Sequence, residues 1–161
     1  MLDNIHDFKL SKKDEYKLEL AIWFHDIVYD STRTDNEKLS ANNFKSFGNI
    51  IGLKNKHIKE ICNLILVTKH NDTVKTESEK IICDLDLREF TSIRSKLNSE
   101  EVRKEFVHLS DEEFYKGRAD FLRKMINKKY IYSTDLYRNS LEELAKHRIT
   151  IELDIIRQMK F

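Results

Sequence analysis

Proline is absent from this chain of 161 residues, and glycine occurs only three times. Hairpin turns and glycine-rich phosphate-binding loops depend on these residue types, so the chain has almost nothing from which to build them. Hydrophobic residues make up 40% of the sequence, which supports a sizeable core, and the length suits one domain. We therefore expect a single all-α domain over residues 1–161, a compact bundle of about seven helices.

Capping signals indicate where several of these helices begin. Each signal places a serine or threonine three residues before an acidic residue, and each precedes an apolar run: SKKD at 11–14, TESE at 76–79 and SDEE at 110–113. Near the C-terminus, apolar residues recur at helical spacing. They predict one long last helix from about Arg138 to the end of the chain.

The charge balance and the cysteines restrict the class of protein. The 29 Lys and Arg residues nearly cancel the 28 Asp and Glu residues, so the basic excess of a nucleic-acid-binding protein is missing. No stretch approaches the roughly 18 to 20 apolar residues of a membrane span, and no signal peptide is recognisable. Cys62 and Cys83 lie in apolar helical stretches, as reduced core residues do. We expect a cytoplasmic protein that binds neither membrane nor nucleic acid.

The stretch LELAIWFHDIVYD, residues 18–30, places a histidine and an aspartate side by side in an apolar helical run. Adjacent helical side chains point about 100° apart, yet both can reach a divalent cation that lies between them. A nitrogen and an anionic oxygen together suit Mn, Fe, Zn, Ni or Co, and the cation offsets the cost of burying a carboxylate. From the residues alone, His25 and Asp26 are explained equally well as a hydrogen-bonded pair near a helix C-terminus.

A third metal ligand would have to come from another helix, and ICDLDLREF, residues 82–90, contains two acids. Asp86 lies three and four residues from apolar positions in this segment, so it should point inward. Asp84 shares a face with Lys80 and Arg88, where an exposed ion pair is the simpler explanation. We therefore favour Asp86 as the ligand and keep Asp84 as the alternative.

Five segments follow one another in a characteristic order: AIWFHDIVYD, DNEKLSA, LILVTKHND, ICDLDL and RKEFVHLSDEEFYKGRADFLRKMINKKYIYST. Together they resemble the HD-domain superfamily of metal-dependent phosphohydrolases, and most closely a bacterial branch with the motifs WFHD.VYD, NE..SA, T..H, D.DL, GR...L and IY. The resemblance extends from the first residues to beyond Tyr132. It implies an HD-domain-like helical bundle that hydrolyses a phosphate ester or nucleotide.

The resemblance also implies roles for individual residues. His25 and Asp26 match the doublet that names the superfamily, and Asp86 matches its distal aspartate, so these three would bind a divalent ion such as Mn, Fe, Zn, Ni, Co or Mg. Asp26 would also orient a metal-activated water, and His70 or Glu37 would assist proton transfer. Taken alone, His70 and Glu37 are explained as charges that complement helix dipoles.

Three further residues are candidates for substrate binding. Arg118 could hold a phosphate group with its planar guanidinium, Lys69 is a weaker candidate, and both could equally be surface residues. Asn36 stands where many HD enzymes have a histidine that binds a second metal. Because asparagine binds first-row metals poorly, we expect one metal ion in the site.

Family members also carry a histidine-rich stretch, HYHN..HI, upstream of the doublet, and its histidine completes the metal site. Here MLDNIHDF, residues 1–8, aligns with the helix that follows this stretch, so His6 is not its counterpart. The spacing of Leu2, Ile5 and Phe8 suggests that the chain begins inside a helix. We therefore expect that the family's first segment is missing and that the metal site is incomplete.

Two alternatives to a hydrolase remain at this point. One is an HD-fold module that binds a nucleotide or a metal without turnover, and the other is a helical interaction protein that keeps the motifs as a remnant. The sequence specifies neither the substrate nor the metal. It also leaves the oligomeric state open, with a homodimer as one alternative.

Overall fold

The computed structural model describes residues 1–71, 73–91 and 95–160, with residues 95–99 described as backbone only. The described residues form helices and no strand, which confirms the all-α prediction. They comprise eight α-helices and two 3₁₀ helices, against about seven expected. The chain divides into two compact units, Met1–Asp86 and Leu87–Phe161, which are taken separately below. The expectation of one domain over residues 1–161 stays a prediction.

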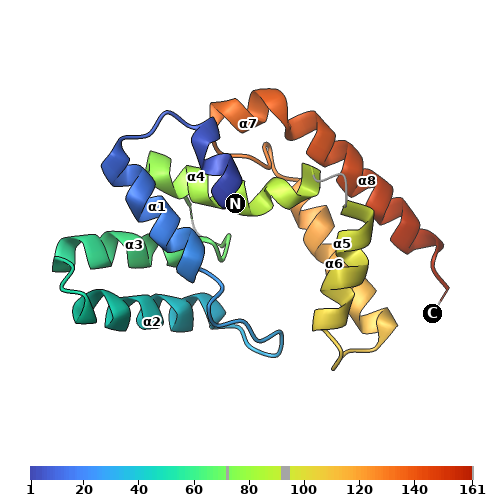
Figure 1. The fold of residues 1–161 in the computed structure, drawn as a ribbon. Coiled ribbons are helices and arrows are strands. Elements are labelled where there is room, and N and C mark those ends of the chain that lie inside the picture. The colour runs from blue at the N-terminus through green and yellow to red at the C-terminus, as the bar shows by residue number, and fades with distance from the viewer. Residues whose placement is uncertain (72, 92–94, 161) are drawn as a thin grey trace. The chain divides into compact units, whose positions relative to one another are not determined.

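The first unit contains η1 (Leu2–Asp7), α1 (Lys12–Phe24), α2 (Asn36–Ile50), α3 (Asn55–Val67) and α4 (Glu77–Asp86). Figure 1 shows α2 and α3 side by side as a hairpin, and α1 packs against both of them and against α4. The core consists of apolar side chains from all four α-helices, among them Leu18, Phe44, Ile61, Ile65 and Ile82. The unit therefore has a core of its own.

Glycines allow the tight turn and the close contact between α2 and α3. Gly52 follows the end of α2 with φ +71°, a conformation that L side chains rarely adopt. The N–H of Leu53 donates to the carbonyl of Gly48 (2.9 Å), and the N–H of Gly52 donates to Asn49, which is the Schellman pattern. A Cβ atom on Gly48 would lie 3.0 Å from Ile58 of α3. Gly48 thus lets the two helices approach closely.

The predicted capping signals are confirmed. The hydroxyl of Ser11 accepts the N–H of Asp14 at the start of α1. At the start of α4, Thr76 accepts the N–H of Glu79, whose carboxylate accepts the N–H of Thr76 in return. Ser110 makes the same reciprocal pair at the start of α6 (Asp111–Ile126). Local sequence therefore determines where these three helices begin.

The second unit contains η2 (Leu87–Thr91), α5 (Ser95–Glu105), α6, α7 (Asp135–Ser140) and α8 (Glu142–Gln158). α8 packs against α6 and also contacts α7 and η2. Buried side chains of this unit come from α6, α7, α8 and the segment before α7, among them Phe114, Leu122, Met125, Ile131, Tyr132 and Ile149.

The predicted long last helix is present as α8, but it begins at Glu142, because Arg138 belongs to the separate helix α7. Leu141 (φ −123°, ψ −19°) separates α7 from α8. The carboxylate of Glu142, at the first position of α8, accepts the backbone N–H of Ile131 at 2.9 and 3.1 Å and that of Tyr132 at 3.1 Å. This tertiary contact fixes the start of α8 relative to the turn at 131–132.

Two further expectations concern the cysteines and the membrane. Cys83 is buried, and Cys62 is partly buried, which raises the pKa of its thiol above the ordinary value. Both positions agree with the expected core cysteines. In the described part of the chain, no helix has the length and apolar character needed to span a membrane.

Candidate functional site

The His-Asp doublet lies at the C-terminal end of α1 rather than inside the helix. His25 is the C-cap residue, and its N–H donates to the carbonyl of Ala21 (2.8 Å). Ile22 is buried, but the Trp23 side chain is 68% exposed, and Ile27 is also exposed. The doublet is therefore at the edge of the core, where Asp26 is open to solvent and the His25 ring is mostly covered.

The imidazole of His25 is held in one orientation by two kinds of contact. Its Nδ1 lies 2.7 Å from the carbonyl oxygen of Ile22, and because a carbonyl can only accept, Nδ1 carries a proton. Its Nε2 lies 3.2 Å from Oδ2 of Asp26 and 3.7 Å from Oδ1 of Asp86. The nitrogen that can bind a cation therefore faces two carboxylates.

The surroundings also change the acidity of this ring. Burial lowers the pKa of His25, but the hydrogen bond and charge of Asp26, the charge of Asp86 and the Ile22 carbonyl outweigh it, so the net pKa is raised above its ordinary value of 6.5. The cationic ring is favoured because the two acids need a positive partner.

His70 comes to the same place from the segment after α3. It has φ +57°, a left-handed conformation that is uncommon for residues other than glycine and typical of the position that follows a helix. Its N–H donates to the carbonyl of Val67, and its Nε2 lies 2.7 Å from Oδ2 of Asp86. The tight turn after α3 thus directs the imidazole to the end of α4. The four residues His25, Asp26, His70 and Asp86 are called the acid–histidine cluster below.

The two acids of α4 are not placed as predicted. Asp84, expected on an exposed face, has 0% of its surface exposed, and Lys80 instead pairs with Glu77 at 3.0 Å. Asp86, expected to point inward, is partly exposed and contacts both histidines of the cluster. The prediction assumed one buried face, whereas residues 81–85 are all buried because α4 packs against both α1 and α3.

Three of the predicted residues lie at or beside the segment between α1 and α2: Asn36, Glu37 and Lys69. The Lys69 ammonium donates to the carbonyl of Thr34 and lies 3.7 Å from Oε2 of Glu37. The Asn36 amide donates to the carbonyl of Asp30 (2.8 Å) and accepts its N–H (3.2 Å). In this structure, Asn36 and Lys69 hold the backbone of the connecting segment, and Lys69 is the residue next to His70.

Arg118 belongs to the second unit, on α6. Its Nε lies 2.8 Å from Oε1 of Glu152 on α8, and its second contact, from Nη2 to Oε2, measures 3.4 Å. Both side chains are largely buried, and the guanidinium lies over the ring of Phe121. Its planar fork is thus paired with a carboxylate that joins α6 to α8.

Sequence reasoning missed Ser40, a fully buried residue of α2. Its hydroxyl accepts the N–H of Val28 (3.2 Å) and donates to the carbonyl of the same residue (3.3 Å). Ser40 therefore fixes the backbone two residues after the doublet. A polar residue within the otherwise apolar face of α2 was the available signal, because a buried hydroxyl requires a partner.

The donors of the cluster suit a divalent first-row metal ion by type. Histidine ligands usually donate their second ring N–H to a carbonyl or carboxylate, as His25 does to Ile22. Two ligands of one ion are about 3 to 3.5 Å apart when each bond is about 2.1 Å, and the ring nitrogen of His25 is 3.2 and 3.7 Å from the two acids. Among the described residues, however, no group of three or more His, Cys, Asp or Glu side chains is assembled as a metal site. Side chains of metal-binding types are therefore present, and the contacts between them are pairwise.

Comparisons with protein-family models, with curated proteins and with solved structures found no match to this chain. The resemblance to HD-domain proteins therefore stays an expectation. The geometry of the cluster is the basis for the function proposed next.

Proposed function

We propose that the protein is a metal-dependent phosphohydrolase that acts on a phosphate ester or a nucleotide. One observation carries the proposal: Nε2 of His25, with its tautomer fixed by the Ile22 carbonyl, lies within 3.7 Å of carboxylates from two different segments, Asp26 and Asp86. Two acids that converge on a single ring nitrogen favour a shared cation.

His25, Asp26 and Asp86 would hold the ion. When bound, a divalent ion supplies a Lewis acid that neutralises charge on a phosphate oxygen and makes water more acidic. Three protein ligands are typical of catalytic metal sites, since they leave room for water and substrate. A ring nitrogen binds a metal ion only without its proton, so metal affinity would rise with pH.

The proposal gives different tasks to the other members of the cluster. Asp26 has 56% of its side chain exposed, so one of its oxygens can reach an incoming water and orient it for attack. His70 holds Asp86 through the 2.7 Å contact and is placed to exchange a proton with solvent or substrate. Glu37 lies 3.7 Å from the ammonium of Lys69, the residue before His70, and could accept a proton through an intervening water.

Substrate binding by the cationic residues would require rearrangement. Lys69 would have to leave the Thr34 carbonyl, and Arg118 would have to leave Glu152, before either could bind a phosphate group. The described residues also contain no assembled group of three metal ligands, so metal binding would require a rearrangement of side chains as well. These observations favour a second candidate function, an HD-like module that binds a metal or a nucleotide without turnover.

One experiment separates the two candidates. The metal-stripped protein is supplied in turn with Mn, Fe, Co, Ni, Zn and Mg, and hydrolysis of p-nitrophenyl phosphate and of a panel of nucleotides is measured. The hydrolase proposal expects metal-dependent turnover that falls at least about a hundredfold in Asp26→Asn. The matched control is Asp120→Asn, an exposed aspartate of α6, which should keep full activity.

Each remaining outcome has a defined meaning. Metal binding that Asp26→Asn abolishes, without turnover of any substrate, would support the binding module. Equal hydrolysis by the wild type and Asp26→Asn would refute the hydrolase proposal, since the activity would then come from elsewhere.

A further inference from the structure

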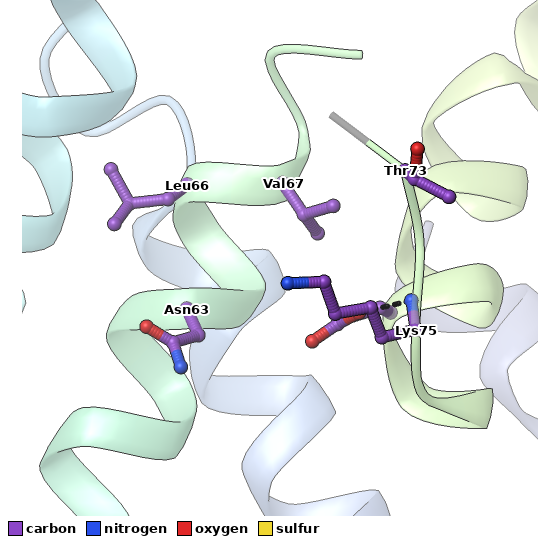
Figure 2. A pocket seen from close by; sticks show the side chains of 6 residues that line it. Asn63, Leu66, Val67, Thr73 and Lys75 are labelled. Atoms are coloured by element: carbon purple, nitrogen blue, oxygen red, sulfur yellow. Dashed lines mark hydrogen bonds between the residues drawn. The ribbon is translucent and has the colours of Figure 1, made fainter. Parts of the chain in front are cut away.

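A cleft of about 510 Å³ lies in the first unit, apart from the residues assigned to the acid–histidine cluster. Figure 2 shows its two walls: the last turns of α3 on one side and the segment that leads into α4 on the other. Its volume is within the range of sites that bind small molecules. The lining residues are Asn63, Leu66, Val67, Thr73, Lys75 and Glu79.

Both walls of the cleft are held by the fold itself. Asn63, Leu66 and Val67 follow the helical spacing i, i+3, i+4 and so share one face of α3. On the other wall, the carboxylate of Glu79 accepts the N–H of Lys75 (2.6 Å) and that of Thr76 (3.1 Å), as part of the capping box that starts α4. These two hydrogen bonds hold the backbone of the second wall at Lys75 and Thr76, which lowers the free energy needed to order it when a ligand binds.

The lining of the cleft contains one cationic side chain, Lys75, and one carboxylate, Glu79. The negative charge of Glu79 is directed to the two backbone N–H groups of the cap. The side chain of Lys75 extends across the cleft towards α3, with its ammonium near Val67 (Figure 2). Among the described residues, no carboxylate pairs with this ammonium. A bound anion would therefore meet an ammonium that has no ion-pair partner among the described residues.

The α3 wall supplies an apolar surface beside that cation. Leu66 remains 41% exposed on this wall, next to the buried Val67. Covering exposed aliphatic surface is favourable by about 25 cal/mol per Å². A bare inorganic ion would leave this surface in water, whereas a ligand with a short hydrocarbon body would cover it. The amide of Asn63 and the hydroxyl of Thr73 add hydrogen-bonding groups at the edges.

We propose that this cleft binds a small organic anion. Its carboxylate or phosphate group contacts the ammonium of Lys75, and its apolar body covers Leu66 and Val67. The inference is independent of the proposed hydrolase activity, because none of the lining residues belongs to the acid–histidine cluster or to the substrate-binding candidates.

The test is a titration of the full chain, labelled on the methyl groups of Leu and Val, observed by NMR. The probes share one chain length and differ only in the head group: hexanoate, hexyl phosphate and the neutral hexanol. We expect saturable shifts at Leu66 and Val67 with at least one anion, and affinity for hexanol at least about tenfold weaker. The tighter anion identifies the head group. No saturable shift with either anion, or equal affinity for hexanol, would overturn the proposal.

Two variants locate the binding. Lys75→Gln should weaken binding of the preferred anion about tenfold, since it removes one charge-assisted hydrogen bond. Lys45→Gln, at an exposed lysine of α2 outside the cleft, is the matched control and should bind as the wild type does. Leu66→Asn should weaken the anion and hexanol alike. Anion affinity that is unchanged in Lys75→Gln would refute the role of the cleft.

Discussion

Glu142 in the second unit and Asp86 in the first each bring distant parts of the chain together through a carboxylate, but their partners differ. Glu142 is 4% exposed and accepts two backbone N–H groups, with Lys146 at 3.1 Å. Asp86 is partly exposed and faces the ring nitrogens of two histidines, with Asp26 close to one of them.

The difference concerns what supplies the positive charge. Glu142 accepts hydrogen bonds from two backbone N–H groups, which do not titrate, so the carboxylate is satisfied by the protein alone. In the acid–histidine cluster, the two carboxylates instead contact imidazole nitrogens, which are common ligands of metal ions. A fixed set of donors indicates a structural role, and a set that depends on an exchangeable cation indicates a binding site.

The largest expected effect on stability is at the structural carboxylate. Glu142→Ala should lower the free energy of unfolding by about 3 kcal/mol, because it leaves the buried N–H groups of Ile131 and Tyr132 without an acceptor. Urea denaturation followed by circular dichroism measures this change. Glu142→Gln keeps one acceptor oxygen and should lose about half as much. If Glu142→Ala loses less than about 1 kcal/mol, the carboxylate does not organise the start of α8.

A smaller effect is expected beside the acid–histidine cluster. Ser40→Ala should cost about 1 to 2 kcal/mol of unfolding free energy, because the N–H and carbonyl of Val28 lose their common partner. It should also weaken metal binding, since Val28 lies two residues after Asp26. Glu142→Ala should leave metal affinity unchanged in the folded protein. Equal metal affinity for the wild type and Ser40→Ala would mean that this backbone contact does not position the doublet.

The smallest effect concerns pH and an exposed acid with fixed partners. Hydrogen bonds from the Ser110 N–H and hydroxyl lower the pKa of Glu113 from its ordinary value of 4.5. Its stabilising contribution is therefore fully present above pH 4.5 and is lost as the pH falls through the lower folded-state pKa. Glu113→Gln should flatten the stability curve slightly below pH 4.5 and should not alter its slope near neutral pH. A changed slope near pH 7 would contradict this assignment.

Local sequence was sufficient to predict the helix starts at residues 11, 76 and 110. Their capping contacts join residues three positions apart, so both partners of each contact lie within the four-residue signal. The all-α class followed from the lack of proline and the scarcity of glycine. The break at Leu141 could not be predicted in this way, because it depends on contacts between Glu142 and residues ten and eleven positions earlier.

The candidate site was only partly predictable for the same reason. The doublet, His70 and Asp86 were recognisable as residues, and the structure brings their side chains together. Helical periodicity misjudged the burial of Asp84, because the sequence does not show how many sides of α4 are covered. The hydrogen bond from Lys69 to the Thr34 carbonyl joins residues 35 positions apart, so no local sequence pattern indicates it.

The most direct test of a shared cation is a calorimetric titration of the metal-stripped protein with Mn²⁺ or Co²⁺, for the wild type, Asp86→Asn and Glu142→Gln. We predict about one binding site per chain in the wild type, affinity at least about tenfold weaker in Asp86→Asn, and unchanged affinity in Glu142→Gln. Binding of equal strength in the wild type and Asp86→Asn, or no binding to the wild type at all, would contradict the assignment of His25, Asp26 and Asp86 to one metal ion.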